Sequence, residues 1–207
     1  HQQVQMGLDW GLVDWRALER HGQLNFLKAG LVRADMISTV SPTYAEEIPT
    51  TDSPIACGLD GLLRARRGDL RGIVNGIDIE VWDPSREPML AKRYDSATVV
   101  SGKAACKAQL QRRASLPERP ETPLFAQIGR LASQKGWDLL AHVADDLLRS
   151  DVQLVVLGTG EPRYYELLNW LASAHPGKVR AFLEFDDTLA HQIEAGADLY
   201  LMPSLYE

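Results

Sequence analysis

An arginine and a lysine stand five residues apart in the stretch QIGRLASQKGWD, where an apolar run gives way to an amphipathic one. Neighbours on a helix face are three or four residues apart, so Arg130 and Lys135 cannot share one face. On a strand-to-helix turn they can close on one anion from two sides, beside the positive N-terminal end of the following helix. A planar guanidinium and a compact ammonium together suit a diphosphate. The alternative is two solvated loop cations, and the local sequence leaves both open.

Two more polar clusters follow predicted strands, and ligands of open α/β sheets bind beyond the carboxyl ends of strands. In GTGEP, Gly158 and Gly160 allow the backbone to approach a ligand, although they also fit an ordinary strand-to-helix turn. This stretch lacks the third glycine and the distant acid of the dinucleotide fingerprint, so a dehydrogenase is poorly supported. Glu207, which follows MPSLY, is either a carboxylate that accepts sugar hydroxyls or a surface residue.

The composition excludes several classes of function. The chain has 207 residues, of which 45% are hydrophobic and 24% charged, as in ordinary globular proteins with a core. Its net charge of -6 gives no reason to expect nucleic acid or an anionic membrane as a partner. No apolar run approaches the roughly 20 residues of a membrane span, and no signal peptide begins the chain. The two cysteines and five histidines show no metal-ligand spacing, so we expect no metal cofactor. His142 and His191 lie in predicted helices, where a structural role is expected.

Apolar periodicity predicts the elements that position these residues. In the first part, it indicates a helix within 22–35, a strand over 36–42 and another strand over 72–78. After residue 100, strands and helices alternate. The predicted strands are 123–129, 152–158, 178–185 and 198–204, and the helices are 102–116, 136–150, 162–174 and 188–197. We expect helix 136–150 to bury Leu139, Leu140, Val143 and Leu147. This alternation predicts an α/β fold with a parallel sheet covered by helices on both faces.

Five segments, in this order, resemble the bacterial glycogen synthase and plant starch synthase family. They are NFLKAGLVRADMISTVSPTYAEEI (25–48), GIVNGIDIEVWDP (72–84), GRLASQKGWDLL (129–140), LGTGEPRYYE (157–166) and EAGADLYLMPSLYE (194–207). The resemblance implies a retaining glycosyltransferase of the GT-B architecture, in which two Rossmann-like domains face each other across a cleft. Residues 1–71 would form the end of the N-terminal, acceptor-side domain. Residues 72–207 would form the first part of the C-terminal domain, which binds the nucleotide sugar.

The resemblance also implies roles for individual residues. Arg130 and Lys135 match the pair that binds the donor's diphosphate and stabilises its departure. The resemblance therefore favours an anion site at this turn over two solvated loop cations. Asn75 matches the family's asparagine near the glucosyl and phosphate groups. Glu207 matches the first acid of the family's Glu-x7-Glu element, which contacts the transferred glucose.

Weaker matches add to the expected donor site. His1 is placed where the family has a histidine near the sugar, although the surrounding asparagine and tyrosine of that motif are missing here. Phe185 falls where relatives have a tyrosine beside the nucleobase, so stacking would survive without the hydroxyl. Gly158 and Gly160 complete the expected substrate contacts.

The implied function is that of an ADP-glucose-dependent glycogen or starch synthase with an α-1,4-glucan acceptor and no metal. The location would be the cytoplasm of a bacterium or the plastid of a plant. The alternatives are another retaining nucleotide-sugar transferase of this architecture and a non-catalytic glucan- or nucleotide-binding module. The chain lacks an initial methionine, the family's Lys-x-Gly-Gly-Leu loop and the rest of Glu-x7-Glu. We therefore expect it to be part of a longer enzyme and inactive by itself.

Overall fold

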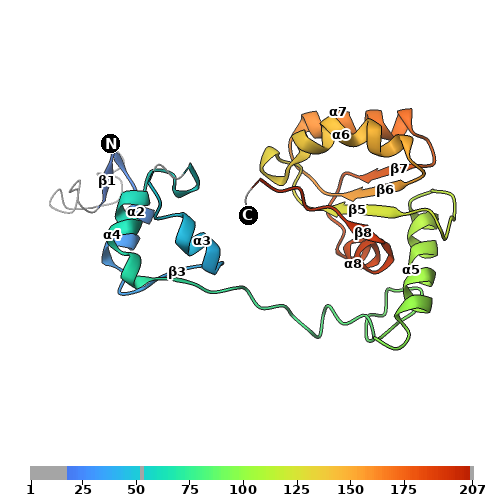
Figure 1. The fold of residues 1–207 in the computed structure, drawn as a ribbon, viewed down its shortest axis with the longest axis horizontal. Helices are drawn as coiled ribbons and strands as arrows, with labels where there is room; N and C mark the ends of the chain where they lie inside the picture. Colours follow the sequence, from blue (N-terminus) through green and yellow to red (C-terminus); the bar gives the residue numbers. More distant parts are fainter. Residues whose placement is uncertain (1–17, 52–53, 206–207) are drawn as a thin grey trace. The chain divides into compact units, whose positions relative to one another are not determined.

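The chain divides into two compact units between Ile77 and Asp78 (Figure 1). The computed structural model describes residues 18–51 and 54–205. Among these residues, no helix is long and apolar enough to cross a membrane. The division at residue 72 expected from the sequence concerns domains of a longer protein, and it stays a prediction.

The first unit combines short helices with a two-stranded parallel sheet. Its elements are β1 Glu19–Arg20, β2 Gln23–Leu24, α2 Phe26–Arg33, β3 Ile37–Thr39, α3 Pro42–Glu47, η2 Pro54–Ala56, α4 Asp60–Ala65, η3 Arg67–Asp69 and β4 Leu70–Gly72. The helix starts follow from local chemistry, because the side chain of Asn25 caps α2 and that of Ser41 caps α3. Apolar side chains from β3, β4 and α4 form the core of this unit. The helix and the first strand predicted in this region are thus confirmed with shorter bounds.

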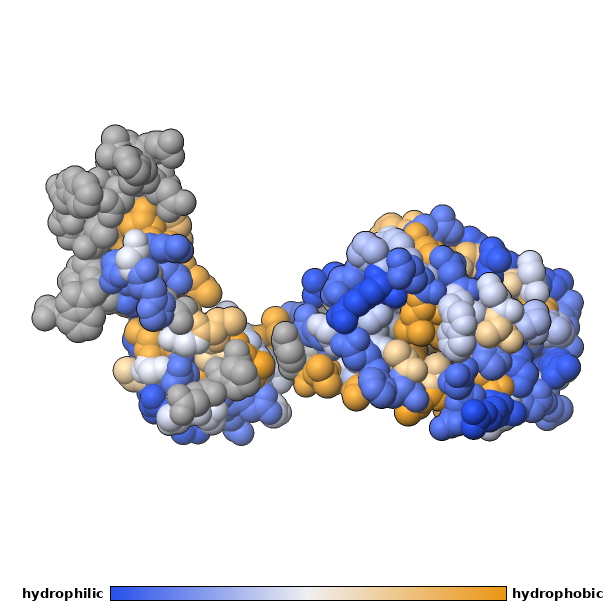
Figure 2. Space-filling view, turned by 90° about the horizontal axis from the view of Figure 1, so that it is seen from above, coloured by the Kyte–Doolittle hydropathy of each residue, from blue (hydrophilic) through white to orange (hydrophobic). Residues whose placement is uncertain are grey.

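The strand predicted over 72–78 is wrong. The observed strand, β4, ends at Gly72, where it pairs with Thr39 at the end of the three-residue strand β3. The Ile73 amide still donates to the Thr39 carbonyl at 2.8 Å, but no strand among the described residues pairs with the chain beyond it. Ile73, Val74 and Ile77 are 63%, 69% and 76% exposed. Figure 2 shows the resulting apolar surface along the stretch that joins the two units. Apolarity made this stretch look like a strand, but a strand also needs a neighbour.

The second unit contains a four-stranded parallel sheet in the order β7-β6-β5-β8. Helices α6 and α7 cover one face, and α5 and α8 lie on the other (Figure 1). The elements are α5 Val99–Arg113, β5 Leu124–Ile128, η4 Ser133–Lys135, α6 Trp137–Arg149, β6 Gln153–Leu157, α7 Pro162–Ala174, β7 Val179–Phe182, α8 Asp187–Gly196 and β8 Leu199–Tyr200. All five residues of β6 are buried, as expected for a strand covered on both faces. The predicted α/β fold is confirmed.

The buried face of α6 differs from the prediction. Two of the residues expected to be buried, Leu139 and Val143, are 51% and 53% exposed, whereas Leu140 is buried. The buried stripe instead follows the spacing of Trp137, Leu140, Ala144 and Leu148. The indole of Trp137 is 1% exposed and its Nε1 donates to the carbonyl oxygen of Arg130 at 3.2 Å. The large ring at the first turn therefore sets which face of α6 turns inward.

Candidate functional site

The loop of residues 129–136, which follows β5, is fixed on the β6 side by backbone hydrogen bonds. The amide of Gly129 donates to Leu157 at 3.0 Å, and that of Leu131 donates to Thr159 at 2.9 Å. In return, the amide of Glu161 donates to the Leu131 carbonyl at 2.8 Å. The segment that begins at the expected anion site is thus an extension of the sheet rather than a free surface loop.

Gly158 and Gly160 make this close approach possible. A Cβ atom at Gly158 would lie 1.9 Å from the carbonyl oxygen of Gly129, and one at Gly160 would lie 2.2 Å from that of Leu131. Both distances are impossible for real side chains. The two glycines are therefore required by packing against the 129–131 backbone, which is the structural explanation that the sequence left open. Their direct contact with a substrate stays a prediction.

The chain that follows β8 packs on the other side of the same loop. Gly136 has a left-handed φ of 75°, and a Cβ atom there would lie 2.0 Å from the carbonyl oxygen of Pro203. The amide of Leu205 donates to the Gln134 carbonyl at 2.9 Å. The loop of Arg130 and Lys135 therefore lies between the GTGEP turn and residues 203–205.

Arg130 lines a cavity of about 220 Å³ at the carboxyl ends of β5 and β6, together with Gly158 and Phe185. The arginine is exposed, and its Nη2 donates to Gln134 Oε1 at 3.4 Å. Phe185 is 90% exposed, so one face of its ring is available for stacking. Three acidic residues also line this cavity, Glu184, Asp186 and Asp187, of which Asp186 caps α8 and pairs with Arg113. Binding of an anion by Arg130 in this cavity stays a prediction.

Lys135 is half-buried and lines an adjoining cavity of about 80 Å³ with Gln127, Tyr200 and Ser204. Helix α6 begins two residues after Lys135, and no side chain caps its N-terminus. The cavities of Arg130 and Lys135 share Ile128 and Gly129. The two cations therefore open on neighbouring cavities that meet at Gly129, and their closure on a single diphosphate stays a prediction.

Three other predicted site residues stay predictions. Asn75 is exposed and belongs to the first unit, three residues after the end of β4. His1 and Glu207 lie outside the described residues. No group of three or more histidine, cysteine, aspartate or glutamate side chains with metal-binding geometry occurs within 18–51 and 54–205.

Sequence reasoning missed two polar residues at this site. Gln127 is 5% exposed and its Nε2 donates to the Lys135 carbonyl at 3.4 Å, while its Oε1 is buried without a hydrogen-bond partner among the described residues. The hydroxyl of Tyr200 accepts from the Ile128 amide at 3.1 Å and donates to the Ile128 carbonyl at 3.0 Å. Burial raises the pKa of Tyr200, which keeps this hydroxyl protonated. A glutamine in the apolar run LFAQIG was the available signal for Gln127.

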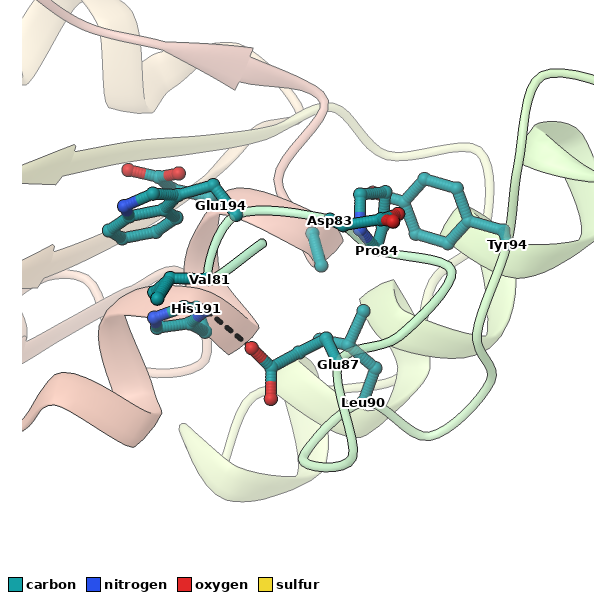
Figure 3. Close-up of a pocket in the computed structure, with 10 residues that line it drawn as sticks. Val81, Asp83, Pro84, Glu87, Leu90, Tyr94, His191 and Glu194 are labelled. Atoms are coloured by element: carbon teal, nitrogen blue, oxygen red, sulfur yellow. Dashed lines mark ion pairs between the residues drawn. The ribbon is translucent and has the colours of Figure 1, made fainter. Parts of the chain in front are cut away.

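A separate cavity of about 150 Å³ lies between the stretch 81–94 and α8 (Figure 3). His191 Nδ1 lies 2.7 Å from Glu87 Oε2, and the two side chains are 8% and 10% exposed. The imidazole also stacks on Trp82, with 4.0 Å between ring centroids and an interplanar angle of 2°. These contacts tie the stretch to the helix, which agrees with the structural role expected for His191.

Two family models match the chain: the starch synthase catalytic domain over residues 1–65 and glycosyl transferases group 1 over residues 109–207. The glycogen synthase of Anaeromyxobacter sp. (strain Fw109-5) is 55% identical over 98% of this chain and 42% of its own length. Glycogen synthase 1 of Geobacter metallireducens is 45% identical over 98% of this chain and 40% of its own length. Among solved structures, the catalytic domain of Starch Synthase IV from Arabidopsis thaliana, bound to ADP and acarbose, is 30% identical with a TM-score of 0.87. It matches 97% of this chain and 42% of its own. The chain thus spans about two fifths of the length of the curated relatives it matches.

Proposed function

Because the chain belongs to the glycogen synthase and starch synthase family of glycosyltransferases, we propose that the complete protein extends an α-1,4-glucan. The donor is ADP-glucose, and the glucosyl group passes with retention to the 4-hydroxyl at the non-reducing end. ADP in the similar plant structure supports this nucleotide over UDP. The names of the relatives support the glucan acceptor, and their bacterial sources favour the cytoplasm over a plastid.

One observation supports the mechanism most strongly: Arg130 and Lys135 lie on a single loop that is fixed to the sheet, and their cavities meet at Gly129. We place the donor diphosphate across Gly129, with Arg130 at one end and Lys135 at the other. The bond between the anomeric carbon and the diphosphate oxygen breaks, and its electron pair moves onto that oxygen. The acceptor's 4-hydroxyl oxygen bonds to the anomeric carbon from the same face, and its proton passes to the departing diphosphate. Positive groups held in place before this step stabilise the transition state more than the bound donor.

The remaining contacts follow from the same placement. The exposed ring of Phe185 lies in the Arg130 cavity, where it can stack on the adenine. Asn75, Glu207 and His1 are proposed to contact the glucosyl group, on the family resemblance of their motifs. The scheme needs no metal ion, because the two basic side chains supply the positive charge.

The test uses the complete protein that the gene encodes. Radiolabelled ADP-glucose and UDP-glucose are each incubated with glycogen, and incorporation is measured before and after digestion with an α-1,4-specific glucosidase. We expect label from ADP-glucose in digestible α-1,4 linkages. A protein that binds ADP but incorporates no label would instead be a binding module. Incorporation from another sugar nucleotide into a different product would assign it to another transferase activity.

A further inference from the structure

The hydrogen-bond ladder between β5 and β8 stops early on the side of the sheet that faces the candidate site. Ala126 pairs with Tyr200, and the amide of Leu201 donates to the Ala126 carbonyl at 2.7 Å. In a regular parallel ladder, the Ile128 amide would next donate to the Leu201 carbonyl. The Ile128 carbonyl would then accept from residue 203, but that residue is Pro203, which has no amide hydrogen.

The hydroxyl of Tyr200 replaces both missing backbone partners. It accepts from the Ile128 amide at 3.1 Å and donates to the Ile128 carbonyl at 3.0 Å. Because a tyrosine hydroxyl is both donor and acceptor, one side chain completes the ladder while β8 turns away toward the 203–205 segment. A phenylalanine ring of the same size could do neither.

Ile128 is the residue at which β5 becomes the loop of the two cations. On the β6 side, this loop is held by three backbone hydrogen bonds of 2.8–3.0 Å. On the β8 side, Gln127 contributes only a long contact of 3.4 Å to the Lys135 carbonyl. Contacts on this side include the Leu205–Gln134 hydrogen bond, near the far end of the loop, and the two hydrogen bonds of the Tyr200 hydroxyl at its start. Tyr200 also lines the cavity of Lys135.

We propose that Tyr200 is a positioning residue of the donor site: its hydroxyl fixes the Ile128–Gly129 hinge and thereby the placement of Arg130 and Lys135 on the diphosphate. This proposal rests on the proposed function for its kinetic consequence. The underlying structural step, which is that the hydroxyl restrains the loop, can be measured without turnover.

The experiment compares Tyr200→Phe with Tyr44→Phe in the complete protein. Tyr44 is the matched control, because its hydroxyl also donates to a backbone carbonyl, that of Ile55, but it lies in the first unit on α3. For Tyr200→Phe we expect kcat to fall about tenfold, since cations displaced by a fraction of an ångström lose transition-state contact. The KM for glycogen should stay within twofold of the wild-type value. Tyr44→Phe should keep both constants within twofold.

Two further measurements separate positioning from simple destabilisation. In a Lys135→Ala background, Tyr200→Phe should cost less than threefold, because residues that act through one group are not additive. Amide hydrogen exchange of residues 128–136 should be faster in Tyr200→Phe and unchanged in Tyr44→Phe. A wild-type protein that transfers no glucose refutes the proposed function, yet the exchange experiment still tests the restraint by Tyr200.

Three outcomes would overturn the proposal. The first is a Tyr200→Phe protein with kcat within twofold of wild type or unchanged exchange at 128–136. The second is full additivity with Lys135→Ala, which would show that Tyr200 acts independently of this loop. The third is a Tyr200→Phe protein that fails to fold, which would make the hydroxyl a general requirement of the fold instead.

Discussion

Replacing Lys135 by alanine tests the charge that the mechanism requires. Two unit charges 4 Å apart attract by about 1 kcal/mol in bulk water and by about 4 kcal/mol at an effective dielectric constant of about 20. Lys135 is half-buried and lines a cavity beside the buried Gln127, so its interaction with a departing diphosphate falls toward the larger value. Removal of one preorganised donor from a site of developing charge costs about 2.7–4 kcal/mol. We therefore expect kcat to fall about 10²- to 10³-fold.

The assay measures initial rates of glucose transfer from ADP-glucose to glycogen with the complete protein. Lys92→Ala is the control, because this lysine is exposed, lies on the same unit and donates its ammonium to the Ser101 hydroxyl, away from both cavities. It should leave the rate unchanged. Lys135→Arg keeps the charge but not the compact ammonium, and it should give an intermediate rate. If Lys135→Ala stays within threefold of wild type, the ammonium does not stabilise the leaving group and the mechanism is wrong.

Three more changes test other parts of the site and the fold. Gly158→Ala brings a Cβ atom within 1.9 Å of the Gly129 carbonyl oxygen, so it should lower the free energy of unfolding by about 1–3 kcal/mol and reduce kcat. The free energy is measured by chemical denaturation, with Gly30→Ala as the control because a Cβ atom there meets no atom within 4 Å. Phe185→Ala should weaken ADP binding, measured by calorimetry, by about 1–3 kcal/mol because stacking on the ring is lost. The unfolding midpoint should not change, because the ring is 90% exposed. Unchanged ADP affinity would show that Phe185 is not part of the site. Burial raises the pKa of Glu194, although the charge of His191 opposes this. Because the folded protein disfavours the ionised carboxylate, the free energy of unfolding falls as the pH rises through this pKa. Glu194→Gln should then raise the melting temperature at about pH 7 but not below about pH 4, and equal gains at both would contradict the sign of the shift.

The second unit could be predicted well because its signals are local. Strands such as VQLVVLG are apolar throughout since both faces of the sheet are covered, and the helices between them have clear periodicity. The position of the Arg130 loop followed from this alternation, because parallel strands present their carboxyl ends at one edge. The part of the site that depends on strand order alone was therefore accessible from the sequence.

The features that sequence analysis missed depend on tertiary neighbours. The buried face of α6 is set by the contact of Trp137 with the Arg130 carbonyl, so counting aliphatic residues chose Leu139 and Val143 wrongly. The stretch 73–78 has the composition of a strand, but the neighbouring strand β3 ends too early to pair with it. Likewise, nothing near Tyr200 in the chain shows that its hydroxyl bonds to Ile128, 72 residues away.

The contacts of Gly158, Gly160 and Gly136 with neighbouring carbonyl groups limit how the sequence of this region can vary. An insertion or a larger residue in any one of the three loops would push on the next, and the displacement would reach both cations. Engineering of donor preference by loop exchange should therefore fail here unless all three segments are exchanged together. Phe185 is 90% exposed and lacks such a constraint, so under the proposed function we expect single substitutions there to alter which base is accepted without displacing the loop of the two cations.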